Sequence, residues 1–212
     1  MPLSTTDRNA LATPSSGSAE RGLGLLYLIA GLLGLLAAVV LLVESIALLK
    51  KPDYVPTCSI NPVLSCGSVM NTPQAAAFGI PNPIIGVAGF AALSMLAVVI
   101  LTGATIRPWL WTATQASVTF AVLFLHWLIY QSLYVIGALC PYCMLVWVVT
   151  IAVFWYTTIH TLQRRRHGPA DSRPRGIVAA LSDYRAAVLT GWYLVIIVLI
   201  AHRFWDYWIT LV

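Results

Sequence analysis

The four cysteines of this chain fall in two short stretches, and their spacing decides which thiol chemistry is available. The stretch CSINPVLSC holds Cys58 and Cys66, and the stretch CPYC holds Cys140 and Cys143. CPYC stands at the start of an apolar helical run, where the positive end of the helix dipole favours a thiolate. It therefore predicts a reactive dithiol, with a structural disulfide or two packed thiols as the alternative.

Cys58 and Cys66 are eight residues apart in a proline-rich stretch, a separation that closes easily into a disulfide ring. Alone, such a ring would only staple the loop. Four cysteines can also hold zinc, but this eight-residue step matches the usual C-x₂₋₄-C half-site poorly, so we predict no metal. Two dithiols on one face of a membrane, in contrast, can exchange electrons through a mixed disulfide.

The electrons from such an exchange need an acceptor. The sequence shows no pattern of haem, flavin or iron–sulfur ligands. A pair in a water-facing loop can accept electrons from a soluble protein, whereas a pair at membrane level can pass them to a lipid-soluble molecule. A membrane quinone, of the menaquinone or ubiquinone type, is therefore the predicted acceptor.

The composition places these cysteines in a membrane protein, because 59% of the 212 residues are hydrophobic and 9% are charged. A soluble domain has about 25% charged residues. Five segments reach the roughly 20 apolar residues that a bilayer crossing needs, and a helix alone satisfies the backbone polar groups of such a segment in lipid. The predicted spans are Leu23–Leu49, Pro83–Thr105, Trp109–Ile136, Pro141–Leu162 and Ala186–Leu211.

The basic residues predict the orientation of these spans. With a cytoplasmic N-terminus, nine of the twelve Lys and Arg residues fall in cytoplasmic segments, as the positive-inside rule requires. The nine are Arg8, Arg21, Arg107, Arg164, Arg165, Arg166, Arg173, Arg175 and Arg185. We therefore expect the C-terminus and all four cysteines on the non-cytoplasmic side of the inner (plasma) membrane, where disulfides persist. This orientation explains the net charge of +5 without nucleic acid as a partner.

The order of the motifs resembles that of bacterial homologues of vitamin K epoxide reductase, integral-membrane enzymes that couple disulfide formation to quinone reduction. The resemblance covers about Leu23–Leu162 and rests on Cys58 and Cys66, then GIPNPIIG at Gly79–Gly86, then CPYC. It implies an all-α integral membrane fold, with a four-helix transmembrane bundle around a quinone pocket plus a fifth transmembrane helix. Several bacterial members carry a thioredoxin-like domain after the fifth span, and here we expect that partner to be a separate exported protein.

The resemblance implies a role for each cysteine. Cys143 would lie nearest the quinone, and Cys140 would be reached by the loop. Cys66 would exchange with Cys140, and Cys58 would meet the external partner. The expected result is disulfide bond formation outside the cytoplasm. The same thiols could instead serve a quinone-epoxide reductase, or all four cysteines could be structural parts of a membrane scaffold.

Three further residues match family positions around the quinone. Asn82 matches an asparagine that hydrogen-bonds a quinone carbonyl, with a turn residue between two prolines as the alternative. Thr72 keeps the hydroxyl that the family places six residues after the second loop cysteine. Trp147 stands where the vertebrate enzymes have a tyrosine, and an indole N–H donates a hydrogen bond but cannot serve as an acid. This change favours quinone reduction over epoxide chemistry.

Other polar residues lie within the predicted spans. His126 and Tyr130 share one helical face with Tyr134, so they either line the quinone pocket or pack between helices. Glu44 lies close enough to the outer interface to snorkel towards it.

The chain divides into four predicted parts. Residues 1–21, rich in Ser, Thr and Pro, are expected to be a disordered cytoplasmic tail. The apolar run that follows is longer than the core of a signal peptide, so we do not expect cleavage there. Residues 22–163 would form the four-helix catalytic domain, 164–185 a basic cytoplasmic loop, and 186–212 the fifth transmembrane helix.

Overall fold

The computed structural model describes residues 15–51, 53–166, 181 and 183–209, and over these residues the regular structure is helical. Five of its helices are long and apolar enough to cross a membrane, which confirms the expected all-α multi-pass membrane fold. They are α2 (Ser15–Lys50), α4 (Asn82–Leu101), α5 (Pro108–Tyr130), α6 (Pro141–Arg166) and α8 (Arg185–Arg203). The short elements are α3 (Cys66–Met70), the 3₁₀ helix η1 (Pro73–Ala76), the π-helix η2 (Gln131–Ile136) and α9 (Trp205–Ile209).

Proline and glycine explain several of the helix limits. Pro108 and Pro141 begin α5 and α6, because proline needs no partner for an N–H in the first turn. The second span ends at Leu101, earlier than the predicted Thr105, and the turn after it contains Gly103 with φ 76°. That left-handed backbone favours glycine and stops the helix. The fifth span ends at Arg203, and Phe204 separates it from α9, so the predicted single helix to Leu211 is interrupted.

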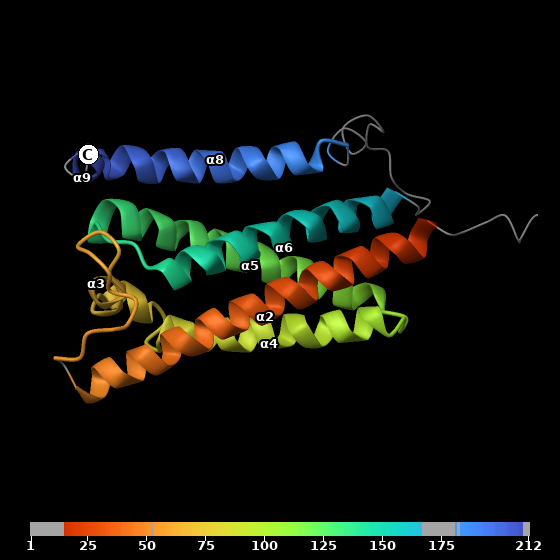
Figure 1. Ribbon diagram of the computed structural model, residues 1–212. Helices are drawn as coiled ribbons and strands as arrows, with labels where there is room; N and C mark the ends of the chain where they lie inside the picture. The colour runs from red at the N-terminus through yellow and green to blue at the C-terminus, as the bar shows by residue number, and fades with distance from the viewer. Residues whose placement is uncertain (1–14, 52, 167–180, 182, 210–212) are drawn as a thin grey trace, which may run out of the picture.

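Helices α2, α4, α5 and α6 form the bundle, with α2 crossing α4 and α6 lying between α2 and α5 (Figure 1). A hydrogen bond of 2.6 Å between the hydroxyls of Tyr27 and Thr157 joins α2 to α6 in the buried core. Gln115 of α5 donates to Thr158 Oγ1 of α6 at 3.0 Å. The polar first half of the third span therefore faces a neighbouring helix at this point, rather than lipid.

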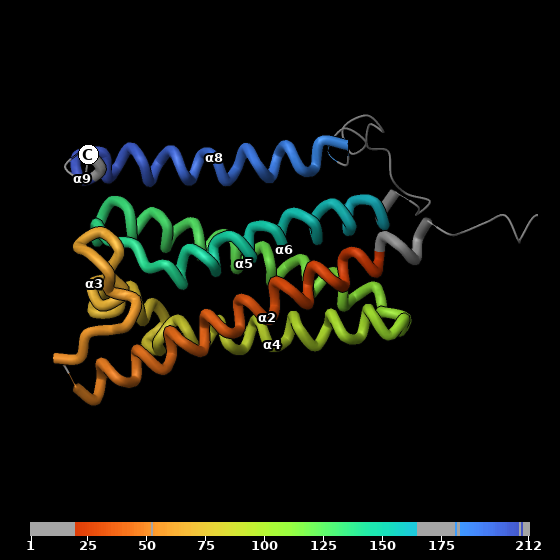
Figure 2. The backbone as a smooth tube through the Cα atoms, in the orientation of Figure 1, coloured from red at the N-terminus to blue at the C-terminus, as the bar shows by residue number. Residues whose placement is uncertain are grey.

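The fifth helix, α8, lies beside this bundle (Figure 1), as the sequence predicts. Its contacts are specific. Tyr193 donates a hydrogen bond to the backbone oxygen of Val148 on α6 at 2.8 Å, and Arg203 Nε donates to the backbone oxygen of Leu133 in η2 at 2.8 Å. Figure 2 shows α3, the start of α6 and α9 at the same end of the molecule.

The predicted division of the chain is only partly visible. Helix α2 begins at Ser15, inside the predicted tail of residues 1–21, and the rest of that tail lies outside the described residues. Most of the predicted loop 164–185 also lies outside them. The tail and the loop remain predictions.

Close packing of α2 on α4 generates a first prediction. A Cβ atom added to Gly34 would overlap the ring of Phe90, which is itself buried. The substitution Gly34→Ala should lower the stability of the purified protein by about 1–3 kcal/mol, because the ring has to move in a packed core. Thermal unfolding in detergent measures this change.

The matched control is Gly89→Ala on α4, where an added Cβ has no heavy atom within 4 Å among the described residues. This variant should be neutral, or more stable by up to about 1 kcal/mol through helix propensity. Equal effects of the two substitutions would contradict the predicted helix contact.

Candidate active site

A short bridge between two loops brings the two cysteine stretches together. Leu64 and Leu139 form an isolated parallel bridge. The N–H of Leu139 donates to the oxygen of Val63 at 2.7 Å, and the N–H of Ser65 donates to the oxygen of Leu139 at 2.9 Å. Cys66 comes two residues after Leu64 and Cys140 directly follows Leu139, so these bonds bring the loop pair beside the CPYC pair.

The sulfur atoms are close enough for thiol–disulfide exchange. Cys58 and Cys66 form a disulfide with a Cα–Cα distance of 5.6 Å, and Cys140 and Cys143 are free thiols. Cys140 Sγ lies 3.0 Å from Cys66 Sγ. Exchange proceeds by attack of a thiolate on a disulfide sulfur, so this contact joins the two pairs directly. Cys58, Cys66 and Cys140 are all buried.

Three of these sulfurs, those of Cys58, Cys66 and Cys140, lie within 4.8 Å of one another, a spacing that also suits a metal ion. Two of them are joined in the disulfide, and zinc binds thiolate sulfur. In the state described, the cluster is therefore better suited to exchange than to coordination.

The start of α6 activates Cys140. The hydrogen bond from the Cys143 thiol lowers the pKa of the Cys140 thiol below its ordinary value, against the opposing effect of burial. The backbone N–H groups of Cys143 and Tyr142 act in the same direction. Because the thiolate is the nucleophile, this position supports the reactive dithiol predicted from CPYC.

A cavity of about 1190 Å³ lies inside the four-helix bundle. Its walls are chiefly apolar and come from α2, α4, α5 and α6. It extends from Asn82, where α4 begins, to Val99 near the end of that helix. Of the four cysteines, all among the described residues, Cys143 alone lines it. The CPYC pair therefore stands between the loop disulfide and this cavity.

Asn82, Thr72 and Trp147 all line this cavity. The Nδ2 of Asn82 donates to the backbone oxygen of Gln74 at 2.7 Å, and its Oδ1 accepts from the N–H of Ala77 at 3.2 Å. These bonds match the turn role considered as the alternative. An amide nitrogen carries two hydrogens, however, so Asn82 retains one donor for a ligand.

The structure does not bring His126 and Tyr130 to the cavity. Trp192 of α8 donates to His126 Nε2 at 3.0 Å, and the other ring nitrogen of His126 lies 2.7 Å from the oxygen of Val122. Tyr130 is 56% exposed and packs against Tyr134, with ring centroids 5.2 Å apart. His126 follows the alternative of helix packing, whereas Tyr130 is largely exposed, and other positions of α5 line the cavity. Their predicted contact with a quinone gains no support from this cavity and stays a prediction.

Glu44 has a role that the sequence did not indicate. Its side chain is buried rather than snorkelling, and its Oε1 accepts a hydrogen bond of 2.6 Å from the Thr57 hydroxyl. The backbone N–H of Thr57 also points to this oxygen at 3.4 Å. Thr57 precedes Cys58, so Glu44 holds the disulfide loop onto the end of α2. An ionisable residue within a span was the available signal.

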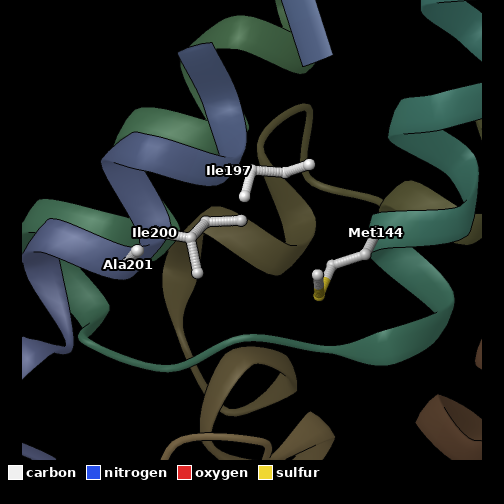
Figure 3. A pocket seen from close by; sticks show the side chains of 4 residues that line it. All are labelled: Met144, Ile197, Ile200 and Ala201. Carbon is white, nitrogen blue, oxygen red and sulfur yellow. The ribbon is translucent and has the colours of Figure 1, made fainter. Parts of the chain in front are cut away.

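A second, smaller hollow lies between α6 and α8 (Figure 3). It measures about 220 Å³ and is lined by Met144, Ile197, Ile200 and Ala201. All four side chains are apolar, so the hollow offers no group that could take part in thiol chemistry.

The fold and the paired thiols define a multi-pass membrane protein with a redox site. Residues 25–158 match the model of the vitamin K epoxide reductase family, which covers more than half of the chain and ends within α6. The chain therefore belongs to the vitamin K epoxide reductase family, and this membership makes it a membrane oxidoreductase. Among curated proteins, none matches the chain.

The contact between Cys66 and Cys140 generates a second prediction. In the double variant Cys58→Ser/Cys143→Ser, the two remaining thiols should oxidise readily to a Cys66–Cys140 disulfide, because a bond needs about 1 Å of further approach. Peptide mass mapping without reductant detects the link. The double variant Cys66→Ser/Cys140→Ser, which keeps Cys58 and Cys143, is the control. Equal cross-linking in both variants would rule out a specific contact.

The bond between Glu44 and Thr57 generates a third prediction. The substitution Thr57→Val leaves a buried carboxylate oxygen without its hydroxyl donor, so the loop should open more often. A soluble dithiol should then reduce the Cys58–Cys66 disulfide about tenfold faster. The measurement uses a background in which Cys140 and Cys143 are serine. Thr102→Val, the same change at an exposed hydroxyl, should leave the rate unchanged. If Thr57→Val is reduced at the same rate as the background, the bond between Glu44 and Thr57 does not hold the loop closed.

Proposed function

We propose that this protein is a thiol–quinone oxidoreductase that carries electrons from an exported thioredoxin-like protein to a membrane quinone of the menaquinone or ubiquinone type. One observation carries the proposal. Cys143 lines the large apolar cavity, while its partner Cys140 lies 3.0 Å from the loop disulfide. The CPYC pair can therefore receive electrons on one side and release them on the other.

The first exchange occurs at the loop. A thiolate of the reduced partner attacks Cys58 and forms a mixed disulfide, and Cys66 leaves as a thiolate. The partner's second thiolate then displaces Cys58, so the partner departs with a disulfide and the loop holds two thiols. Because Cys58 is buried, this step requires the loop to move.

The second exchange passes the same two electrons inward. Cys66 attacks Cys140 of an oxidised CPYC pair and releases Cys143, and Cys58 then attacks Cys66 and releases Cys140. The loop disulfide is restored, and Cys140 and Cys143 are left as thiols. This is the arrangement that the structure describes, with the reducing equivalents on the CPYC pair.

The last step takes place at the cavity. Closing the Cys140–Cys143 disulfide releases two electrons and two protons, which a quinone takes up to become a hydroquinone. Asn82 has one amide hydrogen available for a ring carbonyl, and the apolar walls suit a lipid-soluble molecule. For a two-electron couple, each 30 mV of potential difference supplies about 1.4 kcal/mol, so a quinone acceptor can drive the relay.

The distribution of charge supports the proposed orientation in the inner (plasma) membrane. Arg164 pairs with Glu20 at 3.7 Å, at the end of the bundle opposite the cysteines. Arg107 precedes α5 at that same end, whereas Lys50 lies at the cysteine end. With the arginine-rich end in the cytoplasm, the cysteines and the C-terminus lie on the non-cytoplasmic side, in agreement with the positive-inside rule.

Two other functions use the same residues. A quinone-epoxide reductase needs a proton donor beside the substrate, and the buried Trp147 in the cavity wall cannot act as an acid. A scaffold with structural cysteines gives no reason for a free thiol beside a disulfide and another free thiol in a cavity. Both observations favour quinone reduction.

The fourth prediction tests this function. The purified chain in detergent, supplied with a small dithiol, should reduce a short-chain benzoquinone or naphthoquinone. Cys143→Ser should lower the rate by more than about a hundredfold, because it removes the thiol that lines the cavity. Absorbance of the quinone follows the reaction.

The controls separate the three functions. Thermal unfolding establishes that Cys143→Ser is folded, and the corresponding quinone epoxide replaces the quinone in a parallel assay. Turnover of the epoxide at a rate equal to that of the quinone would favour the reductase alternative. A folded wild type without either activity would favour structural cysteines.

A further inference from the structure

The side chain of Gln131 stands out among the polar groups of the cavity. It lines the cavity together with Cys143 and Asn82. Its Oε1 is buried and has no hydrogen-bond partner among the described residues. Among the described residues, other side-chain N and O atoms are also buried without a hydrogen-bond partner. The residues that carry them do not line the cavity. An unpaired amide oxygen is costly in an apolar, membrane-embedded space, and Gln131 as a whole is only partly buried, so a rotation of its side chain would bring this oxygen to a ligand in the cavity.

Several hydroxyls in the cavity wall already donate to the backbone. Ser45 donates to the oxygen of Leu41 at 2.8 Å, and Thr114 donates to the oxygen of Leu110 at 2.8 Å. Thr72 donates to the oxygen of Val69 at 2.7 Å in the same way. These residues satisfy their own hydrogens locally, whereas Gln131 does not.

The backbone at Gln131 explains the position of this amide. Helix α5 ends at Tyr130, and the π-helix η2 begins at Gln131. The N–H of Gly137 donates to the oxygen of Ser132, five residues earlier, which is the wider spacing of a π-helix. Gln131 and Ser132, the first two residues of η2, line the cavity, and Leu133 is fully buried in the core beside it.

An amide suits both redox states of a quinone. The oxidised ring presents carbonyl oxygens, which only accept hydrogen bonds, and the reduced ring presents hydroxyls, which also donate. The Nε2 of a glutamine can donate to the carbonyl, and its Oε1 can accept from the hydroxyl. A carboxylate would serve only the second state, and a methionine neither.

We propose that Gln131 is a second polar contact for the ring of the quinone, and that its Oε1 accepts the O–H of the hydroquinone formed when Cys140 and Cys143 close their disulfide. This inference rests on the proposed function of the cavity. Two electrons and two protons leave the dithiol, and the two protons become the two hydroxyl hydrogens of the product. Asn82 and Gln131 then hold the ring from α4 and from η2.

The test is Gln131→Met, which keeps the length of the side chain and removes the amide. With a short-chain benzoquinone as the probe and a small dithiol as the donor, the KM for the quinone should rise about tenfold, the value of one hydrogen bond. Inhibition by the corresponding hydroquinone should weaken by a similar factor. The unfolding temperature of the ligand-free protein should stay the same or rise, because an unpaired buried amide is removed.

The matched control is Gln115→Met, the same substitution on the same span. Gln115 is hydrogen-bonded to Thr158 and Thr161 of α6 and is absent from the cavity wall. This variant should unfold at a lower temperature and keep the KM of the wild type. The two glutamines should therefore show opposite behaviour in stability and in substrate binding.

The outcomes separate this inference from the proposed function. If the wild type reduces quinone and Gln131→Met has an unchanged KM, the role of Gln131 is overturned and the function stands. A raised KM accompanied by a loss of stability as large as that of Gln115→Met would also overturn it. If the wild type reduces no quinone, the proposed function itself fails. Should Gln131→Met not fold, Gln131→Asn, whose amide is one methylene shorter, gives the same reading: a raised KM supports the contact, and an unchanged KM overturns it.

Discussion

The two hydrogen bonds between the segments at Leu64 and Leu139 are the interaction on which the redox site depends. Cys66 and Cys140 are 74 residues apart in sequence, and although Cys143 belongs to α6, no single helix contains both pairs. Backbone hydrogen bonds in a buried, apolar setting are directional and costly to break. They place the sulfur of Cys140 against the sulfur of Cys66 in the loop disulfide.

The proposed relay has to satisfy two opposing requirements. Cys66 must stay in contact with Cys140, yet the proposed protein partner must reach the same disulfide. The structure meets the first requirement by holding the buried sulfur of Cys66 3.0 Å from that of Cys140 and by fixing the loop through Glu44 and Thr57. It meets the second through the loop itself, whose described residues form only the short helices α3 and η1. A partner would therefore reach the disulfide when the loop opens locally, since the sulfur atoms are not permanently exposed.

Much of the fold could be predicted from the sequence because hydropathy and proline position are local signals. The five spans, the helix start at Pro141 and the cavity positions of Asn82, Thr72 and Trp147 follow from such signals and from the family motifs. The side of α5 that lines the cavity could not be predicted in this way. His126 and Tyr130 both lie in the regular helix α5, but other positions of that helix line the cavity, and Trp192 of α8 donates a hydrogen bond to His126. The contact of Glu44 with a loop depends on tertiary structure, which residue spacing does not encode.

Phe90 belongs at once to the packing of α2 on α4 and to the wall of the cavity. The flat side chain fits the space that Gly34 leaves open, and its other surface limits the volume available to a ligand. The two positions are therefore subject to a shared steric constraint. In related sequences, a larger residue at the position of Gly34 should be accompanied by a smaller one at the position of Phe90, and such paired replacement would alter the ligand preference while keeping the helices together.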